Sequence, residues 1–431
     1  MKTIKIGLLG MGNIGTGTYQ ALEMNHNKII EASGISFEIT RILEKDVFRK
    51  RGIEVPASKF TQNPDDIFLD PEIQIVIELL GGVQFATEMM MRALQNGKHV
   101  VTANKAALAV NGTLLRKTAI ENKVMLRYEA SVGGGIPIIN ALTQALLANE
   151  FEEILGIVNG TTNYILTQMS EYGLDYDSVL KTAQAKGFAE ADPTADVEGH
   201  DVANKLSILM SLVFGVTVPP SEIPTEGITR ISKDDIDFAA QFGYKIKLLA
   251  TARKVGDELE GHVQPALVPI EHPLASVSNE FNAIFVRGNA VDDLMFYGKG
   301  AGPLPTASAV LGDTIEIGKD IVKGSAFDNR MITDLSHKLK FIGEGLNMYY
   351  VRLITDDVPG VLGKVSTALG DHGISIQTVM QRPKTTDSTA VPVIYIMHAV
   401  TRSRLNEALD EIARFPFIHS IDSIIRVEGK E

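Results

Sequence analysis

The sequence predicts an α/β chain built from three successive parts. Three observations support this fold class. Strand and helix patterns alternate over 1–128, helices precede strands over 129–311, and the order βαββαβ fills 348–427. The length of 431 residues agrees with this division, because a single core rarely serves more than about 250–300 residues.

The first part, 1–128, is expected to hold a doubly wound parallel sheet. Residues 4–9 form a continuous apolar run, which is typical of a strand buried on both faces. Further strands are predicted over 37–43, 73–80, 99–102 and 123–128, with helices such as 87–96 between them. Parallel neighbours need such crossovers, which are right-handed. A segment at about 312–345 is expected to return to this part.

The second and third parts differ from the first in the order of their elements. In 129–311, helices are predicted over 162–172, 176–186 and 197–214, and strands over 245–255, 258–268, 283–288 and 293–297. This pattern is typical of an α+β domain. In 348–427, strands are predicted over 349–354, 374–381, 391–400 and 418–427, helices over 362–372 and 404–414, and a polar loop over 384–389. The resulting βαββαβ order is ferredoxin-like.

Composition excludes several classes of function. The net charge of −12 argues against a nucleic-acid partner, because phosphate binding needs a basic surface. No apolar run approaches the length of a membrane span, and the N-terminal apolar stretch lacks the cleavage pattern of a signal peptide, so we expect a cytoplasmic protein with no membrane partner. Cysteine is absent, which excludes disulfides, thiolate zinc sites and a thioester-forming aldehyde dehydrogenase. A redox step would therefore be a direct hydride transfer between alcohol and carbonyl.

A glycine-rich turn follows the first predicted strand. The segment Gly10-Met11-Gly12-Asn13-Ile14-Gly15 fits G-x-G-x-x-G between a strand and a helix. In a Rossmann-type fold these glycines permit the tight turn, the approach of a pyrophosphate and close helix packing. A structural glycine turn without a ligand is the alternative. We expect dinucleotide binding at Gly10, Gly12, Asn13, Ile14 and Gly15.

The end of the second predicted strand bears on the type of nicotinamide cofactor. Glu44 could accept from a ribose 2′-hydroxyl, which favours NAD(H), whereas Lys45 or a nearby arginine could hold a 2′-phosphate. The basic surplus over 41–51 favours NADP(H), with NAD(H) as the alternative.

A run of acids leads into an apolar helix in the second part. The segment 186–205 contains Glu190, Asp192, Asp196, Glu198 and Asp201 and ends at Lys205. Asp201 and Lys205 are one helical turn apart, on the edge of the stripe formed by Val202, Leu206, Leu209 and Val213. Such a cluster can bind a substrate ammonium and position a proton donor. The alternative is a solvated acidic loop beside a surface lysine.

A second lysine is expected at the carboxyl end of the predicted sheet. Lys105 follows the strand 99–102 directly, and ligands of open α/β sheets bind outside the carboxyl ends of the strands. The alternative is a surface lysine at the start of a helix.

Several motifs together resemble the homoserine dehydrogenase family. They are the segment 186–205, Val100–Lys105 with its ending Thr-Ala-Asn-Lys, the glycine-rich segment 128–137, Asn-Gly-Thr-Thr-Asn-Tyr at 159–164, and Gly-Lys-Gly-Ala-Gly-Pro-Leu-Pro-Thr at 298–306. The resemblance spans residues 1 to about 345, and it implies reversible oxidation of L-homoserine to L-aspartate 4-semialdehyde with NAD(P), a step of threonine and methionine biosynthesis. It also implies a homodimer or homotetramer that pairs through the second part.

The resemblance assigns roles to particular residues. It implies that Lys205 is the proton donor and acceptor, that Lys105 assists near the nicotinamide and the substrate, and that Glu190, Asp196 and Asp201 hold homoserine. It places Lys45 and Gly302 near the cofactor. It also implies a sodium ion bound mainly by backbone oxygens of Glu129, Val132, Gly134 and Ile136, with Gly187 and Glu190 as further candidates.

The third part resembles an ACT domain, a module that usually binds an amino acid at a pairing interface. The resemblance rests on Asp357-Val358-Pro359-Gly360-Val361-Leu362 within the βαββαβ order, and it implies threonine as an effector. A dimerisation module without a ligand is the alternative.

Two other functions are weighed against this one. The first is an amino-acid-sensing, nucleotide-binding regulator without catalysis, and the intact lysines and acids argue against it. The second is another NAD(P)-dependent hydroxy-acid dehydrogenase, which would need a histidine base and an arginine for the substrate carboxylate. His200, Arg230 and Arg287 are weak candidates for those roles.

Overall fold

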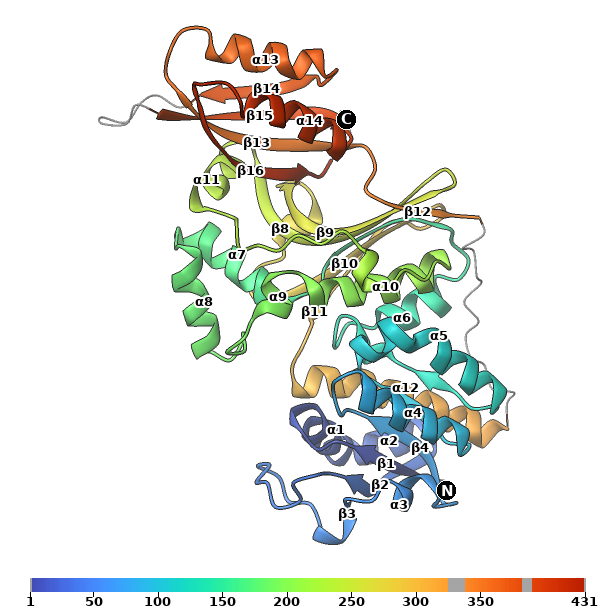
Figure 1. The fold of residues 1–431 in the computed structure, drawn as a ribbon. Helices are drawn as coiled ribbons and strands as arrows, with labels where there is room; N and C mark the ends of the chain where they lie inside the picture. The colour runs from blue at the N-terminus through green and yellow to red at the C-terminus, as the bar shows by residue number, and fades with distance from the viewer. Residues whose placement is uncertain (1, 325–337, 382–389, 430–431) are drawn as a thin grey trace. The chain divides into compact units, whose positions relative to one another are not determined.

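The computed structural model describes residues 2–324, 338–381 and 390–429 (Figure 1). The predicted polar loop 384–389 and residues 325–337 of the predicted return segment lie outside the described residues. Contacts divide the chain into two compact units. The first contains Met1–Glu152, Asn204–Pro220 and Asn282–Lys338, and the second contains Glu153–Ala203, Ser221–Phe281 and Leu339–Glu431. Within the described part of the chain, no helix is both long and apolar enough to cross a membrane.

The first unit contains the predicted parallel sheet. Its strands are β1 (Lys2–Leu9), β2 (Ile35–Leu43), β3 (Phe60–Thr61), β4 (Ile73–Glu78), β5 (His99–Thr102) and β6 (Leu126–Arg127). All neighbours are parallel and the order is β3-β2-β1-β4-β5-β6. This is the order of a dinucleotide-binding fold, in which the connections reverse direction between β1 and β4. The predicted Rossmann-type class is confirmed.

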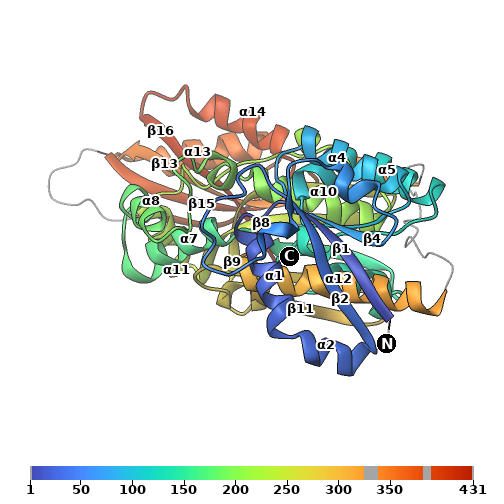
Figure 2. The same ribbon diagram turned by 90° about the horizontal axis from the view of Figure 1, so that it is seen from below.

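Helices cover both faces of this sheet. The unit contains α1 (Asn13–Met24), α2 (His26–Ser33), α3 (Asp65–Phe68), α4 (Gln84–Gln95), α5 (Lys105–Glu121), α6 (Ile138–Asn140) and α12 (Pro303–Lys323). Figure 2 shows α1 and α2 on one side of β1 and β2, with α4 and α5 on the other. The helix α12 joins the core formed by β1, β2 and α1 through Ala307, Val310 and Ile317. The unit also contains β10 (Phe281–Gly288) and β11 (Asp292–Lys299), which are adjacent strands.

The second unit is built around a mixed sheet. Its strands are β7 (Phe151–Ile157), β8 (Tyr244–Val255), β9 (Glu258–Pro269), β12 (Lys340–Gly343), β13 (Asn347–Asp356), β14 (Ile376–Gln381), β15 (Ala390–Val400) and β16 (Ile418–Val427). Their order is β7-β8-β9-β16-β13-β15-β14, and β12 pairs with β9. Its helices are α7 (Gly160–Tyr172), α8 (Tyr176–Ala185), α9 (Thr194–Val197), α11 (Lys233–Gln241), α13 (Val361–Asp371) and α14 (Arg402–Ile412).

The C-terminal βαββαβ module has its own apolar core, to which α13 and α14 contribute Val365, Leu369 and Leu405. Its last strand continues the sheet of the preceding domain, because β16 pairs in parallel with β9 through Arg426–Ala266 and Val427–Leu267. The module therefore falls in one unit with Glu153–Ala203 and Ser221–Phe281 of the middle part. The boundaries 129–311 and 348–427 remain a prediction, because each of the two compact units consists of three separate segments of the chain.

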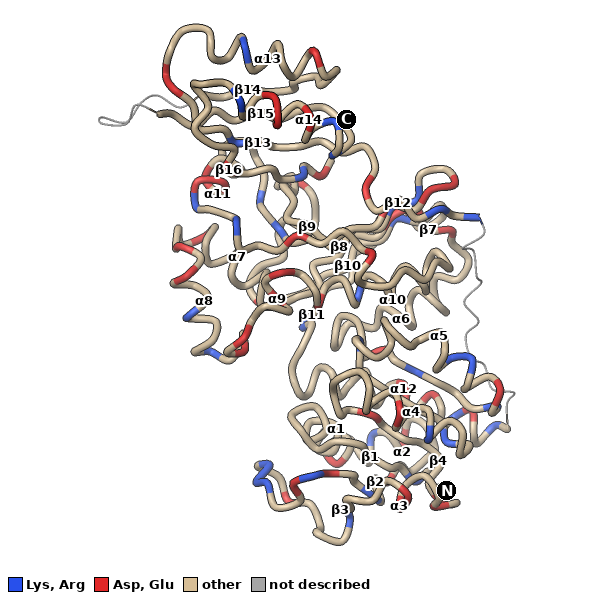
Figure 3. The backbone as a smooth tube through the Cα atoms, in the orientation of Figure 1, with Lys and Arg blue, Asp and Glu red and all other residues tan. Residues whose placement is uncertain are grey.

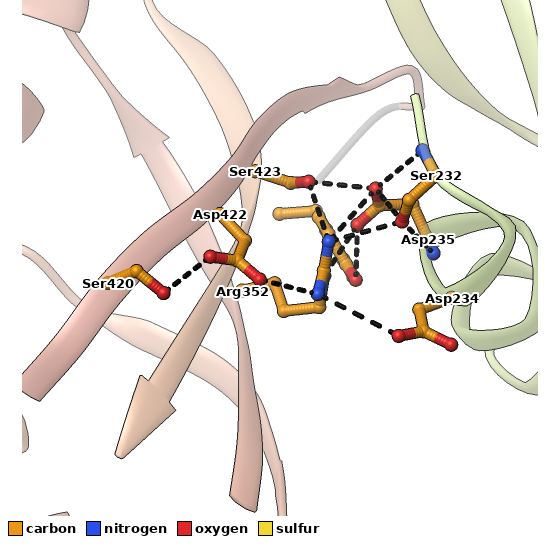
Figure 4. A network of polar contacts seen from close by, with 8 residues as sticks. Ser232, Asp234, Asp235, Arg352, Ser420, Asp422 and Ser423 are labelled. Atoms are coloured by element: carbon orange, nitrogen blue, oxygen red, sulfur yellow. Dashed lines mark hydrogen bonds and ion pairs between the residues drawn. The ribbon is translucent and has the colours of Figure 1, made fainter. Parts of the chain in front are cut away.

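A buried ion-pair network also joins the module to α11. The Arg352 guanidinium of β13 donates from Nε to Asp235 Oδ1 at 2.8 Å and from Nη1 to Asp422 Oδ2 at 2.9 Å (Figure 4). Asp235 is fully buried and also closes the capping box of α11 with Ser232. The network thus fixes β13 and β16 to the start of this helix.

One predicted helix is divided in two. The range 197–214 is predicted to be continuous, but the structure has α9 ending at Val197 and α10 (His200–Phe214) beginning three residues later. Gly199 between them has a φ of +84°, a left-handed conformation that ends one helix and turns the chain into the next. The periodicity of the apolar residues hides this break, because it continues across it.

Candidate active site

The glycine-rich turn lies where β1, β2 and β4 end. Gly10 has a φ of +91°, and a Cβ atom there would lie 2.7 Å from the Leu79 carbonyl oxygen, so only glycine fits. A Cβ atom on Gly15 would collide with the Gly10 carbonyl oxygen. Gly12 differs, because a Cβ atom there meets open space among the described atoms. Its missing side chain is therefore not required for folding, and the space beside it is available to a ligand.

The first turn of α1 offers backbone donors beside this space. Gly12 is the N-cap residue of α1, and glycine has no side chain to cap the helix. The first N–H groups of a helix lack partners within it, and the helix dipole is positive at this end. The turn can therefore bind the pyrophosphate of a dinucleotide.

A cavity of about 1000 Å³ opens beside the turn. It is lined by Gly10 and Gly12, by Glu44 and Lys45 after β2, and by Arg49 and Arg92 among other residues. The loop that joins β2 to β3 carries several basic residues (Figure 3). The volume and lining suit the adenosine half of a nicotinamide dinucleotide.

Glu44 is held against the turn by several bonds. Its carboxylate accepts from the Met11 N–H at 2.9 Å and from the Lys45 N–H at 2.9 Å, and it pairs with Arg51 at 3.4 Å. The Arg51 side chain also donates to the Met11 carbonyl oxygen at 3.1 Å. Lys45, by contrast, is exposed at the rim of the cavity. The negative charge of Glu44 is thus balanced by Arg51 and by two backbone donors.

Gly302 is the N-cap of α12, the helix that packs against α1. A Cβ atom on Gly17 in α1 would lie only 2.6 Å from the Pro303 carbonyl oxygen, which shows how closely the two helices approach. Gly302 itself has a φ of +120° and precedes Pro303 at the first helical position. The start of α12 therefore lies close to the first turns of α1, which follow the glycine-rich turn.

Lys105 begins α5 at the carboxyl end of β5. The helix start is fixed by Asn104, whose side chain accepts from Ala107 N–H at 3.0 Å and donates to the Gly82 carbonyl oxygen at 2.7 Å. The neighbouring Thr102 hydroxyl donates to the buried Glu78 carboxylate at 2.5 Å. Burial raises the pKa of Glu78 above its ordinary value. Lys105 is half-buried at this edge of the sheet.

Lys205 is buried on α10, with only 7% of its surface exposed, and Asp201 one turn earlier is 6% exposed. Both border the apolar stripe that includes Leu206 and Leu209. A small cavity is lined by residues of both α5 and α10, and Arg116 Nη2 of α5 donates to Ser211 Oγ of α10 at 3.4 Å. The helix that begins at Lys105 therefore packs against the helix that carries Lys205.

Asn159, the N-cap residue of α7, contacts two of the acids in the segment 186–205. The Asn159 amide donates to Asp196 Oδ1 at 2.7 Å and to Asp201 Oδ2 at 2.9 Å. Thr161 Oγ1 donates to the Phe188 carbonyl oxygen at 2.6 Å, which holds the loop that leads to Glu190. Glu190 itself is exposed and Asp196 is half-buried. Asp196 and Asp201 are therefore brought together, and both carboxylates lie beside one amide.

The glycine-rich loop after β6 has the backbone of a tight turn. Gly133 and Gly134 have φ values of +71° and +56°, and a Cβ atom on Gly134 would collide with the Gly300 carbonyl oxygen. The Glu129 carboxylate accepts from the Ile139 and Asn140 N–H groups at 2.8 and 2.7 Å, so it caps α6. Val132 and Ile136 are buried in the same loop. Among the described residues, no cluster of three or more His, Asp or Glu side chains could hold a metal ion.

Sequence reasoning missed Asn159 and passed over Glu44 in favour of Lys45. The signal for Asn159 was available, because Asn before Gly-Thr-Thr at a helix start is typical of an N-cap residue, but nothing in the pattern indicated that its amide would reach two acids. The residues of the hydroxy-acid alternative are engaged elsewhere or exposed. Arg287 pairs with Asp293 at 2.6 Å, and His200 is exposed.

Comparisons with known proteins agree with this arrangement. The family model "Homoserine dehydrogenase, NAD binding domain" matches residues 10–129, "Homoserine dehydrogenase" matches 137–315, and "ACT domain" matches 349–417. A homoserine dehydrogenase of Bacillus subtilis is 36% identical over 100% of this chain and 99% of its own length.

Two solved structures extend the comparison. The homoserine dehydrogenase of Thiobacillus denitrificans superposes with a TM-score of 0.92 at 37% identity and covers 99% of both chains. A hyperthermophilic archaeal homoserine dehydrogenase, solved in complex with NADPH, has a TM-score of 0.64 at 26% identity and covers 77% of this chain and 100% of its own. The three family models and the full-length similarity to homoserine dehydrogenases show that this chain belongs to the homoserine dehydrogenase family of NAD(P)-dependent oxidoreductases that act on a CH–OH group.

Proposed function

We propose that this chain interconverts L-homoserine and L-aspartate 4-semialdehyde with Lys205 as the group that moves the hydroxyl proton. The burial of Lys205 on α10 carries this proposal, because an amine with 7% of its surface exposed is held away from bulk water. General acid–base catalysis of this kind contributes roughly 10²–10⁴-fold to a rate.

Other residues of the chain bind the cofactor and the substrate. The bound nicotinamide dinucleotide supplies or accepts the hydride. The glycine-rich turn binds its pyrophosphate, and Gly302 lies near it. In the oxidising direction, neutral Lys205 accepts the hydroxyl proton, and Lys105 assists near the nicotinamide and the substrate oxygen. Glu190, Asp196 and Asp201 bind the substrate ammonium, for which carboxylates are suitable partners.

The test replaces Lys205 by alanine. We expect Lys205→Ala to lose at least about 100-fold in the rate of NADP reduction by homoserine, followed by absorbance, while NADP binding measured by calorimetry stays unchanged. Lys181→Ala, at an exposed lysine of α8, is the control. A rate near that of the unmodified enzyme would remove Lys205 from the mechanism.

The cofactor preference is proposed to be for NADP(H). Two features support it. Glu44 is already bonded to Met11 N–H and paired with Arg51, and Lys45, Arg49 and Arg92 line the cavity beside it. These cations suit a 2′-phosphate. Turnover with NAD and NADP side by side is the measurement, and a higher kcat/KM with NAD would overturn the preference.

A sodium ion is proposed at the loop Glu129–Ile136. Since the Glu129 carboxylate caps α6, a cation here would be bound by main-chain oxygens of Glu129, Val132, Gly134 and Ile136, which hard cations accept as ligands. Gly187 and Glu190 stay further candidates. Activity in sodium chloride against tetramethylammonium chloride at equal ionic strength tests the ion, and equal rates would remove it.

A further inference from the structure

Asn159 is a buried side chain that contacts both of the acids Asp196 and Asp201. It lies between β7 and α7 and is 5% exposed. Its Nδ2 donates one hydrogen to Asp196 Oδ1 at 2.7 Å and the other to Asp201 Oδ2 at 2.9 Å. An amide nitrogen has two hydrogens, so its donor capacity is fully used. The two acids come from different elements, α9 and the first turn of α10, and the amide joins them.

The orientation of this amide is fixed from its other end. Asn159 Oδ1 accepts from the Thr162 N–H at 2.9 Å and from the Thr162 hydroxyl at 3.1 Å. Only the carbonyl end of an amide can accept from the helix N–H, so the NH₂ end must face the carboxylates. The N-cap of α7 therefore sets the direction in which the two donors point.

The chemistry of the bridge suits a cationic ligand. Two carboxylates beside one another repel, and one of them tends to take up a proton. An arginine or lysine between them would cancel their charge, whereas a neutral amide reduces the repulsion through hydrogen bonds and adds no charge. The bridge itself therefore adds no positive charge beside the two acids, which agrees with a substrate ammonium as their ligand.

We propose that Asn159 is a positioning residue for substrate binding, which holds Asp196 and Asp201 together while it does not touch the reacting atoms. This inference rests on the proposed function, because it assigns the two acids to the ammonium of homoserine. It predicts that loss of the bridge weakens substrate binding far more than turnover or cofactor binding.

Asn159→Asp gives the sharpest test. The new carboxylate still accepts from Thr162 N–H, so the helix cap is kept, but both donors are lost and a third negative charge faces the pair. We expect the KM for homoserine to rise at least tenfold, with kcat within threefold and the KM for NADP unchanged. The acidic limb of the pH profile of kcat/KM should move to higher pH, because three clustered carboxylates bind a proton more readily than two.

Asn159→Ser separates the effect of charge from that of the bridge. Serine keeps a cap but cannot reach the acids, so we expect a raised KM for homoserine without the displaced acidic limb. Asp175→Asn, the reverse exchange at the exposed N-cap of α8, is the control and should change neither the KM for homoserine nor the acidic limb. The melting temperature of every variant is measured first, and Asn159→Ser decides the question if Asn159→Asp does not fold.

The outcomes separate this inference from the proposed function. An unchanged KM for homoserine in folded Asn159→Ser and Asn159→Asp would overturn the positioning role. A fall in kcat together with equal rises in the KM for homoserine and the KM for NADP would also overturn it, since such changes indicate general damage. If the unmodified enzyme itself fails to oxidise homoserine, the proposed function fails instead.

Discussion

His99 on β5 is a buried histidine that must stay neutral. Its Nδ1 accepts from the Met125 N–H at 3.0 Å, which a protonated ring could not do. Burial, together with the nearby Arg127, lowers the pKa of His99 to about 4. Between this value and about 6.5, the unfolded chain binds a proton here and the folded chain does not. The free energy of unfolding therefore falls as the pH falls through this window.

Replacement of His99 by asparagine tests this titration. An asparagine Oδ1 can accept from Met125 N–H and does not titrate. We expect the loss of stability of the unmodified protein from pH 7 to pH 4 to exceed that of His99→Asn by up to about 3 kcal/mol. Urea unfolding at both pH values measures the difference. Identical pH dependence in the two proteins would contradict the prediction.

At the scale of residues, the sequence predicted what local spacing determines. Apolar periodicity placed Asp201 and Lys205 one turn apart at the edge of a stripe, and both lie buried on α10. It could not predict that Asn159, 42 residues from Asp201, would bond to it, because that contact depends on how α7 and α10 pack. Contacts between distant segments are set by tertiary packing and leave no local signal.

Among the elements, the strand–turn–helix of β1 and α1 contains two glycines with different expected roles. Replacement of one should affect cofactor binding, and replacement of the other should affect folding. Gly12 faces open space among the described atoms, whereas a Cβ atom on Gly15 meets the Gly10 carbonyl oxygen. We expect Gly12→Ala to raise the KM for NADP at least tenfold with little change in melting temperature, because the methyl group occupies the path of the pyrophosphate. Gly15→Ala should instead destabilise the fold by about 1–3 kcal/mol.

Steady-state kinetics and thermal unfolding of both variants make this comparison. Gly112→Ala is a suitable control, since it lies within α5 and a Cβ atom there meets open space among the described atoms. A Gly12→Ala enzyme with an unchanged KM for NADP would show that the turn is structural only.

The junction of β13 and α11 is a second element-scale feature. Arg352 is 5% exposed and Asp235 is fully buried, so removal of one partner leaves a charge without compensation. We expect Arg352→Met to cost about 3–5 kcal/mol, and Arg352→Met with Asp235→Asn to recover part of that loss. Chemical denaturation of the single and double variants gives the coupling. If the losses in the free energy of unfolding are purely additive, the interaction between Arg352 and Asp235 does not itself stabilise the fold.

Element types were easier to predict than their boundaries and partners. The order βαββαβ followed from alternation and turn residues and is confirmed. The division at Gly199 and the pairing of β16 with β9 were not predicted. That pairing joins residues about 160 positions apart through only two residue pairs, and no period in the sequence encodes it.

For the whole molecule, the ACT domain raises the question of regulation. The domain shares a sheet and the Arg352–Asp235 network with the part that carries Asn159 and Asp201. We propose threonine as its effector, and we expect millimolar threonine to lower the rate of homoserine oxidation. An effector acts through such a module only if it binds two states of the enzyme unequally.

Initial rates with and without threonine test this expectation, with serine as the control amino acid. Inhibition by threonine alone would support an effector site in the module. An unchanged rate at millimolar threonine would leave the module with a structural or pairing role. The oligomeric state, predicted to be a homodimer or homotetramer, can be measured in the same samples by light scattering.

The parallel pairing of β9 with β16 limits how this enzyme could be re-engineered. Beside the pair, the Arg426 guanidinium binds the Glu260 carboxylate at 3.0 Å, and both side chains are at most 2% exposed. A shortened chain that stops before β13 would leave Glu260 without this counter-charge and would uncover the edge of β9 at Ala266 and Leu267. An uncovered strand edge promotes aggregation. An ACT domain transplanted from another enzyme would need a last strand that pairs with β9 and an arginine at the position of Arg426.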